Sequence, residues 1–227
     1  MLAAELHCHS ELSHDGRDPV SMLVEQAAAV GLDVLAVTDH DEIAASRRAA
    51  ELAADYGIVG IVGTEVTSAA GHVLGLGIEE PVPAGLSFDE TLDRIHDAGG
   101  LAVVPHAYQK SRHGVAAHVT EEQLAAADAI EVFNSRLLTG RGNRQAEAFA
   151  VEHDIPSVAG SDAHVSEMVG QAVTQIGTDE RSAAAVLDAI RDGRTSVVGS
   201  KTPWHVSFRQ AAGGAKRRVR RRIAELL

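Results

Sequence analysis

Short apolar segments alternate with longer amphipathic or alanine-rich segments along most of the 227-residue chain. The apolar segments have the length of buried strands, and the segments between them have the length of helices. Strands that are separated by helices in this way predict a parallel α/β sheet or barrel. The predicted strands cover residues 3–8, 34–38, 58–63, 72–77, 102–106, 129–133 and 157–159.

Several of the predicted helices have recognisable ends. Pro19 is typical of a first helical residue, Thr120 begins a capping-box sequence, and Gly31 and Gly57 follow predicted helix ends. No internal repeat or change of composition occurs before about residue 200, so we expect one domain over residues 1–200 and a C-terminal extension with a basic helix over residues 201–227. The predicted helices cover residues 19–30, 42–56, 88–98, 121–127 and 144–153.

Composition narrows the class of protein. No apolar run approaches the roughly 18 residues that a membrane span needs, and the N-terminus lacks the pattern of a signal peptide. The one cysteine, Cys8, cannot form an internal disulfide, which fits a reducing compartment. We therefore expect a cytoplasmic protein with no membrane partner. The net charge of −12 argues against broad, non-specific binding of nucleic acid.

The basic charge is concentrated near the C-terminus. Residues 216–222 contain six of the 20 lysines and arginines. This segment could contact RNA, DNA, anionic lipid or an acidic subunit, or it could be a solvated helix that packs through Val219 and Ile223. The sequence leaves these alternatives open, and it does not indicate an oligomeric state.

Imidazoles and carboxylates follow almost every predicted strand. The carboxyl ends of strands are where α/β proteins gather functional groups, and these side chains are ligands for divalent metals. In His7-Cys-His9 the two imidazoles point to the same side of an extended chain, so Cys8 faces away and packs in the core. The groups at the strand ends are His7, His9, His40, Glu65, His106, Asn134, Asp162 and His164.

The other histidines carry a weaker signal. They lie in helical, loop or tail segments, where a histidine is usually a hydrogen-bonded structural group. We assign that role to His96, His113, His118, His153 and His205.

The ordered motifs His-x-His-Ser, Thr-Asp-His, Gly-x-Glu, Pro-His and Gly-Ser-Asp-x-His resemble those of the PHP (polymerase and histidinol phosphatase) superfamily. The resemblance extends from residue 6 to about residue 170. It implies an α/β fold of the distorted (β/α)7 barrel type and two or three bound divalent ions, usually zinc, manganese or iron, with magnesium as a further candidate. It also implies hydrolysis of phosphoester bonds.

The same resemblance implies a set of metal ligands. The first site would contain His7, His9, Glu65 and Asp162. Glu65 would bridge to a second site that contains His106. A third site would be built from Asp15, His40 and His164.

Three positions in this set stay open. His14 adjoins Asp15 and is the alternative ligand in that segment, although we favour Asp15. His72 matches a histidine of the nucleotide- and oligonucleotide-phosphatase branch and is either a ligand, a phosphate contact or a structural group. Asn134 stands where many relatives have a histidine and is a weaker ligand. The second site would then hold its ion loosely, or it would be completed by water and substrate. Two firmly held ions with a labile third are therefore as compatible with the sequence as a full set of three.

The implied reaction is in-line attack on phosphorus by a metal-bound hydroxide. Glu65, His106 and Arg136 are the predicted catalytic residues, and Arg136 is the best candidate to hold the substrate phosphate, followed by Lys110 and Arg112. Glu167 is a candidate partner that orients an imidazole.

The expected substrate is small and phosphorylated: a nucleotide, a short oligonucleotide, or a sugar or amino-alcohol phosphate. The intervals between motifs leave no room for a large inserted domain, so we expect a compact form of the barrel. The alternative is a metal-binding accessory module that acts on partners through the basic tail. Hydrolysis of C–N bonds is less favoured, because no lysine follows a predicted strand where amidohydrolase barrels carry a bridging carboxylated lysine.

Overall fold

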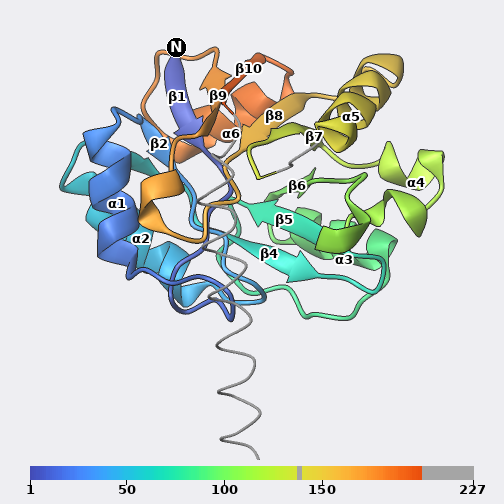
Figure 1. Ribbon diagram of the computed structural model, residues 1–227, viewed down its shortest axis with the longest axis horizontal. Coiled ribbons are helices and arrows are strands. Elements are labelled where there is room, and N and C mark those ends of the chain that lie inside the picture. The colour runs from blue at the N-terminus through green and yellow to red at the C-terminus, as the bar shows by residue number, and fades with distance from the viewer. Residues whose placement is uncertain (137–139, 201–227) are drawn as a thin grey trace, which may run out of the picture.

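The computed structural model describes residues 1–136 and 140–200, and its strands form two five-stranded sheets (Figure 1). The first sheet has the order β10-β9-β1-β2-β3 and contains β1 (Leu2–Glu5), β2 (Val34–Leu35), β3 (Val59–Gly60), β9 (Ala172–Ile176) and β10 (Thr195–Gly199). The second has the order β4-β5-β6-β7-β8 and contains β4 (Gly63–Thr67), β5 (His72–Leu76), β6 (Leu101–Val104), β7 (Ala129–Asn134) and β8 (Ser157–Gly160).

Each sheet combines parallel and antiparallel pairs. Strands β1, β2 and β3 pair in parallel, as do β6, β7 and β8. Strand β9 is antiparallel to β1 and β10, and β5 is antiparallel to β4 and β6. The predicted α/β class is confirmed, but a closed barrel of seven strands is not shown.

The differences from the predicted strands have physical causes. The apolar run 58–63 looks continuous, yet it contains the whole of β3 and the first residue of β4, which belong to different sheets. Strands β4 and β5 form a hairpin because the turn at Ser68–Gly71 is too short for a helical crossover. Strands β9 and β10 were not predicted.

Five of the α-helices lie on the outer sides of the two sheets. Helices α1 (Val20–Ala29) and α2 (Ala44–Ala54) flank the first sheet, and α3 (Phe88–Asp97), α4 (Glu121–Leu124) and α5 (Arg141–Glu152) flank the second (Figure 1). The capping box predicted at Thr120 is present at the start of α4. The remaining helices are α6 (Ala183–Arg191) and the short 3-10 helices η1 (Lys110–Arg112), η2 (Val115–Ala117) and η3 (Ser166–Met168).

Apolar residues from both sheets meet in one cluster, which we call the interior core. Leu6 and Val34 come from the first-sheet side, Leu76 and Val103 from the second, and Ile190 of α6 packs against them. All are nearly or fully buried, so the interior core joins the sheets by packing. Its buried members are Leu2, Ala4, Leu6, Val34, Ala36, Ile61, Leu74, Leu76, Leu101, Val103, Ala129, Val158, Ile176, Val186, Ala189 and Ile190.

Two short seams also join the sheets. An isolated bridge connects His40 to Glu65 at one seam, and another connects Cys8 to Ala163 at the other. Beside the second seam, the buried Thr174 hydroxyl accepts a hydrogen bond from the Ala159 amide at 2.8 Å and donates to the Ala159 carbonyl at 3.1 Å. A side chain thus supplies bonds that a strand ladder would otherwise make between β8 and β9.

Among the described residues, no helix has the length and apolar character that a bilayer crossing requires. The predicted basic helix at 216–222 and His205 lie outside the described residues.

Candidate metal centre

Nine imidazole and carboxylate side chains converge near the two seams. Most of them lie in the loops that follow the strands. We call this group the carboxyl-end cluster. The first sheet supplies His7 and His9 after β1 and His40 after β2, and the second supplies Glu65 on β4 and His72 on β5. The members are His7, His9, Asp15, His40, Glu65, His72, His106, Asp162 and His164.

The carboxyl-end cluster forms one wall of a cavity of about 590 Å³. His14, Arg112, His113 and Arg136 also line this cavity. The side chains of His7 and His9 lie beneath it and have no exposed surface, whereas Asp15 keeps 33% of its side chain exposed. The group is therefore deeply buried on one side and open to solvent on the other.

Glu65 lies at the centre of the cluster. Its Oε2 atom is 3.1 Å from Nε2 of His9 and 3.3 Å from Nε2 of His7. Its Oε1 atom is 2.7 Å from Nδ1 of His72 and 3.3 Å from Nε2 of His106. A single carboxylate thus faces four imidazoles, which come from the ends of β1 and β6 and from strand β5, and this is the arrangement expected of a bridging ligand.

Ligand atoms in the cluster lie close enough to surround more than one cation. Five sets of three side chains place their ligand atoms within 4.8 Å of one another, and each of the nine members occurs in at least one set. The sets share His7, His9, His40, Glu65 and Asp162, so neighbouring sites would have ligands in common. They are His7/His9/Glu65, His9/Asp162/His164, His9/Asp15/His40, His40/Glu65/His72 and His7/His106/Asp162.

Several buried side-chain atoms of the cluster make no hydrogen bond, as expected of atoms that coordinate a cation. Among the described residues, seven buried side-chain nitrogen or oxygen atoms make no hydrogen bond, and six of them belong to the cluster. Both ring nitrogens of His9 are among them, as is Oε1 of Glu65, whose close approach to His72 lacks hydrogen-bond geometry. Buried polar groups are rarely left unpaired, so these atoms fit metal coordination.

The electrostatics favour the ligand form of the carboxylates. Burial opposes ionisation of Glu65, but His7 and His40 hold its pKa well below the usual value. Burial likewise opposes ionisation of Asp162, and Arg136 and Arg112 hold its pKa well below the usual value. Both side chains are therefore anionic at neutral pH, as coordination requires.

The imidazoles differ from one another. Burial and the positive charge of Arg136 lower the pKa of His164 to about 3, so this ring is neutral. Burial opposes charge on His40, yet Glu65 and Asp15 raise its pKa to about 9. His40 thus carries a proton between two carboxylates, in the position where a bound cation would compete with that proton.

Glu131 is a functional residue that the sequence analysis did not assign. Its Oε1 atom accepts a hydrogen bond from Nδ1 of His7 at 2.9 Å, and its Oε2 atom accepts one from the His106 amide at 2.9 Å. Gly160 makes room for it, because a Cβ at that position would lie 2.1 Å from Oε1 of Glu131. Such a carboxylate fixes the orientation and tautomer of His7 and leaves Nε2 to face the cluster. The only sequence signal was an acidic residue in the middle of an apolar strand.

Two arginines point into the cavity at Asp162. Arg136 Nη1 lies 2.7 Å from Oδ1 of Asp162, and Arg112 Nη1 lies 3.1 Å from Oδ2. They come from different loops, one after β7 and one in η1. Their convergence places two guanidinium groups beside the cluster.

The backbone is strained at two cluster positions. His106 has φ of 33° and Asp162 has φ of 50°, in the left-handed region that non-glycine residues seldom adopt. Each such residue costs about 1–3 kcal/mol. Strain of this kind is held by the surrounding structure and is common in active sites.

Asn134 is at the centre but uses its side chain for other bonds. Its Nδ2 donates to Glu131 Oε2 at 2.9 Å and contacts Asp162 Oδ2 at 3.3 Å, while its Oδ1 accepts from the Arg136 amide. These bonds fit a residue that positions the carboxylates, and the role of Asn134 as a weak metal ligand stays a prediction.

The remaining predictions have mixed outcomes. His113 lines the cavity and its ring lies 5.0 Å from that of His72, so it lies beside the centre, and its structural role stays a prediction. Gly71 permits this contact, because a Cβ there would lie 2.1 Å from the His113 carbonyl oxygen. Lys110 lines a neighbouring cavity and not this one.

Three other side chains lie outside the centre or face away from it. Glu167 is exposed on η3. His96 lies on the surface and bonds to Asp128 at 2.8 Å, which agrees with a structural role. Cys8 is fully buried and donates to the Ala36 carbonyl, which confirms that it packs in the core.

Comparison with known proteins agrees with this geometry. Residues 5–130 match the PHP domain, and residues 140–195 match the PHP-associated segment. The match to the PHP domain covers more than half of the chain, so the chain belongs to the PHP family.

Among its relatives is an uncharacterised protein of Methanocaldococcus jannaschii, 30% identical over 145 residues, which are 59% of this chain and 82% of that protein. A phosphoribosyl 1,2-cyclic phosphate 1,2-diphosphodiesterase of Eggerthella lenta is 39% identical over 99 residues, which are 40% of this chain and 37% of that enzyme.

Solved structures share the fold at low identity. A two-domain protein of Bacteroides vulgatus that contains a PHP-like metal-dependent phosphoesterase superimposes with a TM-score of 0.75 at 21% identity, over 88% of this chain and 65% of that one. A lesion-specific endonuclease of Pyrococcus furiosus superimposes with a TM-score of 0.65 at 16% identity, over 86% of this chain and 57% of that one. The chain thus spans less than two thirds of either protein.

Proposed function

We propose that this chain is a metal-dependent phosphoesterase that hydrolyses a small phosphorylated substrate such as a nucleotide, a short oligonucleotide or a sugar phosphate. The observation that carries the proposal is the carboxyl-end cluster, in which six buried ligand-type atoms make no hydrogen bond. The relative from Eggerthella lenta, named as a cyclic-phosphate diphosphodiesterase, supports the same reaction class. The PHP-like structure from Bacteroides vulgatus, described as a predicted phosphoesterase, does so as well.

Each part of the site has a proposed role. His7, His9, Glu65 and Asp162 would hold one ion, with His106, Asp15, His40, His164 and His72 available for a second and a third. Zinc, manganese and iron are the candidate metals, because the donors are imidazole nitrogens and carboxylate oxygens. When bound, such ions supply an activated water and positive charge for the phosphate oxygens.

The chain's own cations would bind and orient the phosphate. Arg136 and Arg112 place their Nη1 atoms at the cavity beside Asp162, at 2.7 Å and 3.1 Å from its oxygens. A guanidinium matches the geometry of a phosphate by donating two parallel hydrogen bonds. Glu131 would act through His7, whose ring it orients at 2.9 Å.

The test is hydrolysis of p-nitrophenyl phosphate and of its bis ester by metal-stripped protein, before and after addition of Mn²⁺ or Zn²⁺. Activity should appear only with metal and should be lost in His9→Ala. His118→Ala is the matched control, because His118 is exposed and outside the cluster. Bound metal without hydrolysis of any ester would overturn the proposal and favour the accessory module.

A further inference from the structure

A second cavity, of about 710 Å³, lies beside the metal centre. One wall is the loop between β6 and α4, and the other is the first part of α5. It is lined by Ala107, Tyr108, Gln109, Lys110, Ser111, Gly114, Ala116, Ala117, Arg141 and Gln145.

The two cavities adjoin, because the same stretch of chain lines both. His106, Arg112 and His113 face the metal centre, whereas Tyr108 and Lys110 face the second cavity. Ser111 lines both. A molecule that occupies both cavities would therefore pass Ser111.

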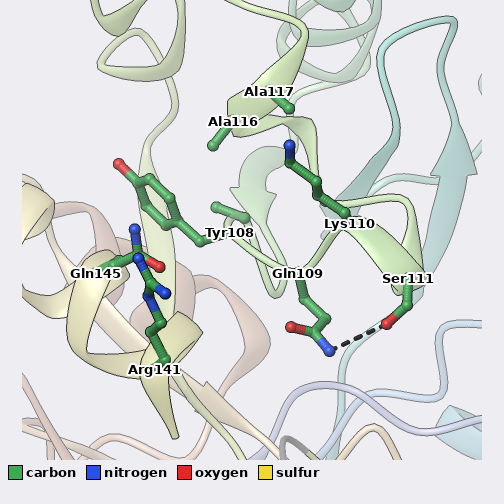
Figure 2. Close-up of a pocket in the computed structure, with 10 residues that line it drawn as sticks. Tyr108, Gln109, Lys110, Ser111, Ala116, Ala117, Arg141 and Gln145 are labelled. Atoms are coloured by element: carbon green, nitrogen blue, oxygen red, sulfur yellow. Dashed lines mark hydrogen bonds between the residues drawn. The ribbon is translucent and has the colours of Figure 1, made fainter. Parts of the chain in front are cut away.

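The lining of the second cavity is chemically selective. Lys110 and Arg141 are cations, Gln109 and Gln145 carry amides, and none of the described residues that line the cavity is a carboxylate. Figure 2 shows Tyr108, Arg141 and Gln145 on one side of the cavity and Lys110 on the other. In a chain with a net charge of −12, a cavity with cations on two sides and no acid favours an anion.

Part of this lining is held in place. The Nε2 atom of Gln109 donates to Oγ of Ser111 at 3.1 Å, and the ring of Tyr108 lies 6.3 Å from that of Phe149 on α5. Amide and hydroxyl groups fixed in this way can donate hydrogen bonds to phosphate oxygens, and the two cations would balance the phosphate charge.

We propose that the second cavity binds a second phosphate group of the substrate whose first phosphate is hydrolysed at the metal centre. The preferred substrate class is then a compound with two phosphates, either a bisphosphorylated small molecule or a short phosphorylated oligonucleotide. This inference rests on the proposed phosphoesterase function and narrows it.

The test compares two pairs of compounds that differ by one phosphate. Glucose 6-phosphate is compared with glucose 1,6-bisphosphate, and thymidylyl-(3′→5′)-thymidine with its 5′-phosphorylated form. For the metal-loaded enzyme, kcat/KM should be at least about tenfold higher for the two-phosphate member of one pair, the effect of one charged hydrogen bond. The favoured pair identifies a small molecule or an oligonucleotide as the source of the second phosphate.

The variants separate the second cavity from the metal centre. Lys110→Gln and Arg141→Gln should lower kcat/KM at least fivefold more for the two-phosphate member than for its one-phosphate counterpart. Gln145→Glu adds a carboxylate at an exposed position with almost no change in shape and should have the same selective effect. Arg48→Gln is the matched control, because Arg48 is exposed on α2 and pairs with Glu51. Equal kcat/KM within both pairs, or equal losses in the variants, would overturn the inference.

A failure of the proposed function is recognised separately. If no ester is hydrolysed, the phosphoesterase proposal fails, and the same pairs are titrated into the metal-loaded protein by calorimetry. Tighter binding of a two-phosphate member, lost in Gln145→Glu, would still support the second cavity. Equal affinities within both pairs would overturn it.

Discussion

The interior core and the carboxyl-end cluster are both buried between the same two sheets, but they are stabilised in opposite ways. Core residues such as Leu76 and Ile190 fill space with apolar side chains, which carry no polar atom to pair. In the cluster, His9 is equally buried and both of its ring nitrogens make no hydrogen bond. The interior core contributes to stability through packing. The carboxyl-end cluster holds strained backbone and unpaired polar atoms, and these atoms would coordinate a bound ion.

The largest expected effect is on the cluster. His9→Ala should lower phosphoesterase activity by about a thousandfold, because a lost metal ligand removes several kcal/mol of transition-state stabilisation. The free energy of unfolding of the metal-free variant should change by less than about 1 kcal/mol, since removal of two unpaired buried nitrogens offsets the lost packing. Activity assays and urea denaturation of the metal-stripped protein measure the two quantities. A large loss of stability would contradict the contrast between the two regions.

The complementary change is in the interior core. Ile190→Ala on α6 should lower the free energy of unfolding by about 3 kcal/mol, because it opens a cavity in a fully buried site. Activity per folded molecule should stay within about twofold of wild type, because α6 contributes no residue to the cluster. Denaturation curves and activity at a temperature where the variant is folded test this. Loss of activity in the folded variant would show that the regions are coupled.

Glu131→Gln tests a residue that borders the cluster without belonging to a ligand set. The glutamine side chain is neutral and has one acceptor oxygen, so it cannot accept hydrogen bonds from both Nδ1 of His7 and the backbone amide of His106. His7 is therefore less well oriented. Activity or metal affinity should fall by about 10–100-fold, as for other partners of ligating histidines. Glu152→Gln on the exposed face of α5 is the control. An unchanged metal affinity together with an unchanged rate would assign Glu131 to folding alone.

The smallest effect is expected at the link between β8 and β9. Thr174→Val preserves shape but removes the hydroxyl that bonds both the amide and the carbonyl of Ala159. Two buried backbone groups lose a partner, which should lower stability by about 1–2 kcal/mol. Thermal unfolding measures this change. If Thr174→Val is as stable as wild type, packing alone joins the sheets at this place.

The same contrast explains what could be predicted from the sequence. His7, His9 and His40 each follow a short apolar strand, and that local placement was enough to predict their convergence. Glu131 was missed because its role depends on Gly160, which lies on another strand and makes room for it. The place of His113 beside the centre was missed because it depends on contacts between distant segments: the His72 amide donates to the His113 carbonyl, and Gly71 leaves room for this approach.

The strands show a similar division. Parallel strands preceded by helices were predicted, whereas the hairpin of β4 and β5 was not, because the run 58–63 contains no marker of the change of sheet. Strand β9 did carry a signal, since Ala172, Thr174 and Ile176 alternate as buried residues. Its antiparallel pairing with β1 depends on contacts between segments far apart in the sequence, which local patterns do not encode.

The position of the cluster at both seams has a consequence for motion. Its ligands come from both sheets, and the bridges from His40 to Glu65 and from Cys8 to Ala163 are the described points where the sheets meet beside it. A cation held by His9 and Glu65 would link the two sheets, and opening of a seam would release it. Amide hydrogens along both seams should then exchange more slowly as metal is added, so hydrogen exchange would record occupancy of the site as rigidity of the fold.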